Sequence, residues 1–211
     1  EVKFMPPFPE KKDLSLEDFT KSYTKLLAES VQAIDFNILE KIVSLITDSA
    51  NRASTIYTCG NGGSSSIAEH LVCDFVKGIS TNTDLQPRVF SLLSTPILTA
   101  TANDISYDEV FSFQIEKYGK ENDLLICVSS SGNSENILKV IKKAKSMGIP
   151  TISFVGFDRG KVKEESDLSL HVKVDNYGLA EDSHHMLMHI LAQFIRLKSI
   201  QNSEDISNIK F

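Results

Sequence analysis

The residues of this chain that are best suited to chemistry begin with a glycine- and serine-rich segment at residues 59–66 (CGNGGSSS). Glycine lets the backbone turn tightly and brings N–H groups close to a ligand, which is the use we expect for Gly60, Gly62 and Gly63. A helical pattern follows at once, and the start of a helix adds unpaired N–H donors and a partial positive charge. The serine hydroxyls, Ser64 first among them, add further donors. The segment therefore predicts a site for an anion such as a phosphate, or for a sugar.

The known nucleotide-binding loops do not fit this turn. The phosphate loop of NTPases carries a Lys and a Ser or Thr after its last glycine, and this turn has no lysine. A dinucleotide-binding turn has Gly or Ala where Ser65 stands and an acidic residue at the end of the following strand, whereas Asp84 precedes the next apolar run. A strand-to-helix turn that binds nothing remains the alternative for this segment alone.

A second polar segment, residues 129–134 (SSSGNS), also follows an apolar run and precedes a helical pattern. A helix N-terminus needs only one polar side chain as its cap, so capping leaves most of this run unexplained. Serine is favoured at caps in any case, and the segment alone is equally compatible with a bare cap. Two such loops in one small sheet favour a sugar phosphate, held by N–H and hydroxyl groups because neither loop contains a lysine. The serines concerned are Ser129, Ser130, Ser131 and Ser134.

Two helical segments carry ionisable residues at a spacing of four. His70 and Asp74 follow the first loop and share one face of the predicted helix. An exposed pair of this kind contributes only about 0.2–0.5 kcal/mol, which is the alternative to a functional role. Glu181, His185 and His189 recur in the same way near the end of the chain. A histidine in such an apolar helix is more often a hydrogen-bonded core residue than a catalyst, so the residues alone leave both interpretations open.

Apolar runs that alternate with helical patterns must position these residues. We predict strands at residues 54–58, 88–93, 124–128, 151–155 and 168–172. Helices between and after them are expected at residues 96–102, 108–118, 135–147 and 181–198. Strands that alternate with helices form a parallel sheet with right-handed crossovers, so the fold class is α/β, a three-layer sandwich with a five-stranded parallel sheet between helices. Ligands bind such sheets beyond the carboxyl ends of the strands, where both polar loops begin.

We expect a single domain over residues 1–211, since this length is ample for one core. Its parts would be an extended lead-in at 1–14, an N-terminal helical pair at 15–52, the α/β core at 53–199 and a tail at 200–211. The two N-terminal helices precede any strand. They are therefore expected to pack outside the sheet or against another subunit.

Composition and charge narrow the function classes. The net charge of −6 argues against a general nucleic-acid-binding surface. No apolar run approaches the roughly 20 residues that cross a membrane, and the chain begins without a signal-peptide pattern. The cysteines Cys59, Cys73 and Cys127 lie in or beside apolar segments and indicate reduced thiols in a cytoplasmic protein.

Three motifs together resemble one known family. Residues 60–64, 129–134 and 177–191 resemble the sugar isomerase (SIS) domain, and within it the sedoheptulose 7-phosphate isomerase (phosphoheptose isomerase) group. The resemblance covers about residues 15–198. It implies a five-stranded parallel sheet, a homotetramer with active sites at subunit interfaces, and often a zinc ion, one per subunit.

The resemblance also implies roles for individual residues. The family's catalytic histidine falls on His189 and its catalytic glutamate on Asp74. Zinc would be held by two histidines and two carboxylates, a donor set that suits this ion: His70, Asp74, Glu181 and His189. The substrate would be bound by Asn61, Gly62, Gly63, Ser64, Asn103, Asp104, Ser129, Ser130, Ser131, Ser134 and Glu181. No role is assigned to His184 or His185.

Two positions depart from the family pattern. Asp74 is one methylene shorter than the family's glutamate, so its carboxylate reaches about 1.5 Å less far, and proton transfer needs a separation near 3 Å. Glu181 stands where relatives carry Gln, and the added negative charge favours a bound metal. These changes are compatible with a shifted substrate, stronger metal dependence or lost catalysis.

The expected activity is an aldose–ketose isomerisation. Sedoheptulose 7-phosphate would become D-glycero-D-manno-heptose 7-phosphate through an enediol, with Asp74 and His189 moving a proton between C1 and C2 and zinc polarising the carbonyl. The product would feed heptose-nucleotide or surface-polysaccharide synthesis. The alternatives are a non-catalytic SIS protein that binds a sugar phosphate or a replication initiator, and an isomerase of another ketose phosphate.

Overall fold

The computed structural model describes residues 4–158 and 160–201. Its helices are α1 (Leu16–Gln32), α2 (Phe36–Asn51), α3 (Gly63–Cys73), α4 (Thr95–Asp104), α5 (Ser112–Tyr118), α6 (Glu135–Ser146), α7 (Gly160–Glu165) and α8 (Tyr177–Ser199). A π-helical segment continues α3 and a short 3-10 helix follows α4; they are η1 (Asp74–Ile79) and η2 (Tyr107–Glu109). The strands are β1 (Thr55–Gly60), β2 (Arg88–Ser91), β3 (Leu124–Ser129), β4 (Thr151–Val155) and β5 (Leu168–His171).

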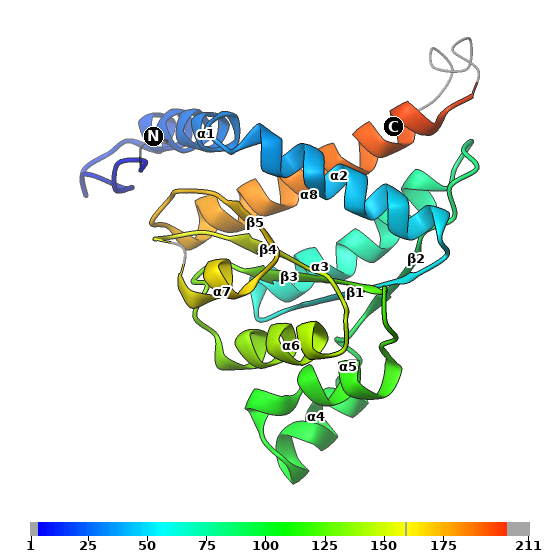
Figure 1. Cartoon of the computed structure of the whole chain (residues 1–211). Helices are drawn as coiled ribbons and strands as arrows, with labels where there is room; N and C mark the ends of the chain where they lie inside the picture. Colours follow the sequence, from blue (N-terminus) through cyan, green and yellow to red (C-terminus); the bar gives the residue numbers. More distant parts are fainter. Residues whose placement is uncertain (1–3, 159, 202–211) are drawn as a thin grey trace.

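The five strands form one parallel sheet in the order β2-β1-β3-β4-β5. Helices cover both of its faces (Figure 1), which confirms the predicted α/β fold. The register pairs Gly60 with Val128, so β1 and β3 end side by side. Both polar loops therefore leave the same edge of the sheet, from neighbouring strands.

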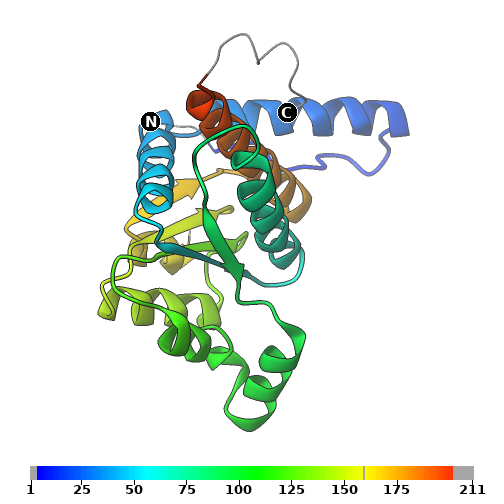
Figure 2. The same cartoon turned by 90° about the vertical axis from the view of Figure 1, so that its right-hand side faces the viewer.

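Alternate strand residues pack on opposite faces of the sheet. Ile56, Leu124 and Ile126 lie in a core with residues of α2, α3 and α8, whereas Tyr57 and Leu125 lie in a second core with residues of α5 and α6. The same layers are visible in Figure 1 and, turned by 90°, in Figure 2. Burial of both faces explains why the strands read as continuous apolar runs.

The two N-terminal helices do not share one environment. Helix α2 lies in the same layer as α3 and α8, because Ile42 and Ile46 are 0% and 1% exposed and belong to the core over the sheet. The expectation that both helices pack outside the sheet is therefore wrong for α2, whose apolar stripe covers a sheet face. Helix α1 instead packs against α8, where the Tyr23 hydroxyl donates to Asp182 Oδ2 at 2.6 Å.

Several element boundaries also differ from the prediction; for example, only Ser112–Tyr118 of the helix predicted at 108–118 is α-helical. Helix α8 begins at Tyr177 rather than at residue 181, because the Asn176 side chain accepts the N–H of Leu179 as an N-cap. Strand β2 ends at Ser91, whose hydroxyl accepts the N–H of Leu93. Of the predicted tail, residues 202–211 lie outside the described part of the chain.

Candidate functional site

The carboxyl ends of β1 and β3 open into a hollow of about 260 Å³, which we call the serine pocket. The turns that follow the two strands form much of its wall, and the first turns of α8 complete it. Its lining residues are Asn61, Gly62, Gly63, Ser64, Val128, Ser129, Ser130, Ser131, Ser134, Tyr177 and Glu181. The structure thus brings together every serine that the sequence analysis assigned to phosphate.

The two helices that begin at the serine pocket have open N-termini. No side chain of the described residues caps the first turn of α3 or of α6. Helices α1, α2 and α8 each have a capping side chain, from Ser15, Asp35 and Asn176 respectively, whereas α4 and α5, like α3 and α6, have none. The unpaired N–H groups of α3 and α6 therefore remain available to an anion in the pocket.

Close packing of the two loops explains the glycines at the end of β1. A Cβ on Gly60 would lie 2.6 Å from the carbonyl oxygen of Ser64 and 3.0 Å from that of Val128. Gly62 has a φ of +55°, a conformation that other residues rarely adopt. Across the loops, the hydroxyl oxygens of Ser64 and Ser130 lie 3.5 Å apart. The glycines thus allow the two sets of donors to converge.

Glu181 places a carboxylate at one side of the serine pocket. A Cβ on Gly63 would lie 2.3 Å from Glu181 Oε2, so the carboxylate packs directly against the backbone at the start of α3. Burial, and then the nearby Asp182 carboxylate, raise the pKa of Glu181. This negative group faces the helix end where a phosphate is expected to bind.

The predicted sugar-binding residues fall into two places. Asn61 lies in the serine pocket, and its side chain is fixed by Asn136, with amide contacts of 2.8 and 3.0 Å, and by the Tyr107 hydroxyl at 3.0 Å. Asn103 and Asp104 lie at the end of α4, where Asn103 Nδ2 donates to Asp104 Oδ1 at 2.8 Å. The structure does not bring these last two residues to the serine pocket of the same chain.

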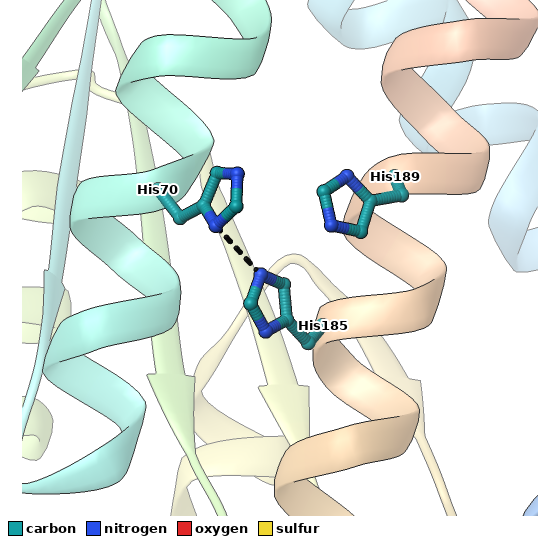
Figure 3. A group of neighbouring side chains, drawn as sticks. All are labelled: His70, His185 and His189. Atoms are coloured by element: carbon teal, nitrogen blue, oxygen red, sulfur yellow. Dashed lines mark hydrogen bonds between the residues drawn. The ribbon is translucent and has the colours of Figure 1, made fainter.

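Three histidine side chains converge between α3 and α8, as Figure 3 shows, and we call them the histidine cluster: His70, His185 and His189. His70 Nδ1 lies 2.9 Å from His185 Nε2. The His185 and His189 rings, one helical turn apart on α8, stack with centroids 4.9 Å apart, and the His70 ring stands nearly perpendicular to both. One ligand atom from each ring lies within 4.8 Å of the others.

Asp74 joins two of these rings from the side of α3. Its Oδ2 lies 2.5 Å from His189 Nδ1, and its Oδ1 lies 3.3 Å from His70 Nε2. The residue begins the π-helical segment η1, and such wide turns inside helices occur often at functional sites. The predicted catalytic pair, Asp74 and His189, is therefore in direct contact, although the catalytic role itself stays a prediction.

The predicted catalytic pair, Asp74 and His189, opens into a different hollow from the serines. This second hollow of about 390 Å³ is lined by Cys73, Asp74, Lys77, Gly78, His189, Ala192, Gln193 and Arg196. None of these residues lines the serine pocket. Within one chain, the predicted phosphate site and the predicted proton-transfer pair thus face separate spaces.

The predicted zinc ligands are brought together only in part. His70, Asp74 and His189 are in contact, whereas Glu181 lies against Gly63 in the serine pocket. Burial, and then the neighbouring His70 and His189, lower the pKa of His185. The ring is therefore neutral near pH 7, the form in which imidazole binds a metal.

His184, the other histidine without a predicted role, belongs to the core. It is 0% exposed and its ring packs against Phe154, with centroids 6.1 Å apart. Burial lowers its pKa to about 4. Its place on α8 faces the sheet, so it does not join the histidine cluster.

Sequence reasoning missed several residues of this region. Helical spacing does mark His185, since it lies four residues from both Glu181 and His189, but the sequence alone assigns it no role. Tyr177 lines the serine pocket, and its only sequence signal is its place in the motif at residues 177–191. Asn136 and Tyr107, which hold Asn61, carry no local signal, because their contacts form only when distant segments pack together.

Comparison with known proteins places this geometry among sugar isomerases. The SIS domain family matches residues 18–156. A phosphoheptose isomerase of Clostridium acetobutylicum is 36% identical over 157 residues, 74% of this chain and 80% of that protein. A phosphoheptose isomerase of Helicobacter pylori strain P12 is 36% identical over 187 residues, 87% of this chain and 94% of that protein. A solved phosphoheptose isomerase from Neisseria gonorrhoeae matches with a TM-score of 0.78 and 25% identity, over 86% of this chain and 98% of that one.

The described helices include none with the length and apolar character needed to span a membrane.

Proposed function

The chain belongs to the SIS domain family and, within it, to the phosphoheptose isomerases, and we infer that it interconverts sedoheptulose 7-phosphate and D-glycero-D-manno-heptose 7-phosphate. The observation that carries this conclusion is a pocket of glycines and serines at the start of α3, together with a carboxylate–imidazole contact between Asp74, just past the end of that helix, and His189 on α8. The first feature binds a sugar phosphate and the second moves protons. The product would enter heptose-nucleotide or surface-polysaccharide synthesis.

The serine pocket supplies the phosphate site. The backbone N–H groups at the starts of α3 and α6 would donate to the phosphate, and Ser64, Ser130 and Ser131 would add hydroxyl donors. Asn61, held in place by Asn136, would orient a sugar hydroxyl at the rim of the pocket. Asn103 and Asp104 stay proposed contacts to the sugar.

The Asp74–His189 pair carries the proton transfers of the proposed reaction. Starting from the ketose, the Asp74 carboxylate takes a proton from C1, which gives an enediol, and the proton returns to C2. His189 is held by Asp74 through Nδ1, so its second nitrogen can give a proton to the oxygen on C2 and accept one from the oxygen on C1. One proton thus moves between the carbons and one between the oxygens, and the ketose becomes an aldose.

The distance between these two parts supports a site shared by two subunits. Ser64 and Asp74 are ten residues apart along one helix, which corresponds to about 15 Å. The two parts also line separate hollows, which have no lining residue in common. We therefore propose a homotetramer in which the serine pocket of one subunit faces the Asp74–His189 pair of a neighbour. The proposed location is the cytoplasm, in keeping with three free cysteines.

We also propose that the site binds a zinc ion, because its side chains offer the ligand atoms that zinc prefers. Imidazole nitrogens and a carboxylate from His70, His189 and Asp74 lie together, and zinc prefers such ligands. A bound zinc ion would polarise the substrate carbonyl and stabilise the enediolate.

The test is turnover of sedoheptulose 7-phosphate, followed by NMR in D₂O with and without added Zn²⁺. The wild-type protein is expected to form the aldose and to exchange the C1 hydrogen for deuterium. His189→Ala is expected to lose both activities, while Met186→Ala, a change at an exposed position on the same helix, keeps them. No turnover and no exchange in a folded oligomer would indicate a different ketose phosphate as substrate or a non-catalytic role.

A further inference from the structure

A third hollow, of about 660 Å³, lies beside the edge strand β2, and we call it the edge hollow. Strand β2 is the outermost strand of the sheet (Figure 1), and the helices on this face end short of it. Phe90 of β2 pairs in register with Tyr57 of β1, yet Phe90 is 56% exposed and Tyr57 only 6%. The lining residues are Thr55, Tyr57, Arg88, Phe90, Ser91, Leu92, Ser94, Pro96, Ile97, Gln114, Lys117, Tyr118, Lys120 and Asp123. None of them lines the serine pocket or the hollow of the predicted catalytic pair.

The edge hollow carries positive charge, although the chain as a whole has a net charge of −6. Its cations are Arg88, Lys117 and Lys120. Lys117 lies 3.3 Å from the Glu116 carboxylate, whereas the side chains of Arg88 and Lys120 form no hydrogen bond or ion pair with the described residues. The one carboxylate among the described lining residues, Asp123, is 6% exposed and accepts a backbone N–H on each oxygen. Two cations without a partner favour an anionic ligand, which they bind through charge-assisted hydrogen bonds.

Aromatic rings lie beside these cations in the edge hollow. Phe90 on β2 and Tyr118 on α5 are 56% and 48% exposed, which is unusual for rings that line a hollow of the sheet. The buried Tyr57 ring lies between them in the lining, and its hydroxyl donates to the Tyr118 carbonyl oxygen at 2.9 Å. A planar aromatic group of a ligand can stack on exposed rings of this kind. The lining therefore suits a ligand that has both an anionic group and an aromatic ring.

Gln114 adds a hydrogen-bond acceptor to the edge hollow. Its side chain is 2% exposed, and its Nε2 donates to the carbonyl oxygens of Leu92 and Val110 at 3.0 and 2.7 Å. Both N–H bonds of the amide are thereby used, while Oε1 accepts no hydrogen bond from the described residues. An N–H or O–H group of a ligand can supply the hydrogen bond that this acceptor lacks.

We propose that the edge hollow binds a nucleoside diphosphate. The diphosphate lies at Arg88 and Lys120, the base stacks on Phe90, and an N–H or O–H group of the ligand donates to Gln114 Oε1. The volume lies within the range of about 300–1,000 Å³ that small-molecule sites have. The sugar phosphate of the proposed isomerase reaction has an anionic group but no aromatic ring, so it does not account for this lining. The inference thus goes beyond the proposed function.

The test measures nucleotide binding to the full-length protein by titration calorimetry, with ADP and GDP as probes. One nucleotide is expected per chain, and pyrophosphate and adenosine, which each carry half of the ligand, are expected to bind at least about tenfold more weakly than ADP. Arg88→Ala and Phe90→Ala are each expected to weaken ADP binding by about tenfold or more. The matched controls are Lys41→Ala, an exposed cation on α2, and Phe36→Ala, whose ring is also 56% exposed. Both controls are expected to bind ADP within about twofold of the wild type.

Three results would overturn the assignment. The first is no binding of ADP or GDP at millimolar concentration, as when a second copy of this chain covers the hollow. The second is pyrophosphate binding as tightly as ADP, which would reduce the site to a general anion site. The third is a loss of ADP binding in Ser131→Asp, which puts a carboxylate in the serine pocket and would place the nucleotide there. Unfolding temperatures show whether each variant folds, and Arg88→Gln serves if the alanine variant does not.

Discussion

Mixing two inactive variants tests whether one active site needs two subunits. Ser131→Asp places a carboxylate in the serine pocket at a half-buried position. His189→Ala leaves that pocket intact and removes the proton-transfer pair. Each variant alone is expected to be inactive, because each lacks one part in every subunit. A mixed oligomer regains whole sites only if the two parts come from different chains.

The size of both effects can be estimated. A carboxylate about 5 Å from a phosphate costs about 3 kcal/mol per unit charge at an effective dielectric constant of about 20, which is more than a hundredfold in affinity. In an equal, random mixture, half of the serine pockets are intact and half of the neighbouring histidine clusters are intact. About a quarter of the shared sites are then complete, so about a quarter of the wild-type rate is expected.

The assay compares co-expressed chains with chains purified apart. The two variants carry different tags, and copurification shows that they share oligomers. Turnover of sedoheptulose 7-phosphate per site is measured for the co-expressed mixture and, as the control, for separately assembled variants combined just before the assay. A copurified mixture as inactive as its parents would refute the reasoning, since it would mean that serine pocket and catalytic pair of one chain serve the same sugar.

Three further changes follow from single contacts. Glu181→Gln removes a carboxylate from the serine pocket, so KM for the sugar phosphate is expected to fall several-fold at pH 8. The difference in KM should shrink at lower pH, because burial and Asp182 raise the pKa of Glu181 and the wild-type carboxylate is then increasingly protonated. Gly60→Ala puts a Cβ 2.6 Å from the Ser64 carbonyl oxygen, and denaturant titration is expected to show a loss of about 1–3 kcal/mol in unfolding free energy. The pKa of His184 is about 4 in the folded protein and near 6.5 in the unfolded chain. This group therefore leaves the free energy of unfolding unchanged above about pH 6.5 and lowers it by up to about 3 kcal/mol as the pH falls toward 4. In metal-free protein, His184→Gln should lose this part of the pH dependence.

The fold and the phosphate site could be predicted because their signals are local. Strands buried on both faces must be apolar throughout, so the run from Leu124 to Val128 marks a central strand without further information. The glycines and serines of each loop stand next to one another in sequence, at the end of such a strand. Parallel strands then bring the loops to one edge, as the pairing of Gly60 with Val128 shows.

The histidine cluster could be predicted only in part, because it depends on how α3 and α8 face each other. Helical spacing puts Glu181, His185 and His189 on one face of α8, yet it does not say which turn lies beside His70. Packing places His70 beside the second and third of these residues and leaves Glu181 with the serines. The misjudged position of α2 has the same origin, since an amphipathic pattern shows that a helix packs but not against which surface.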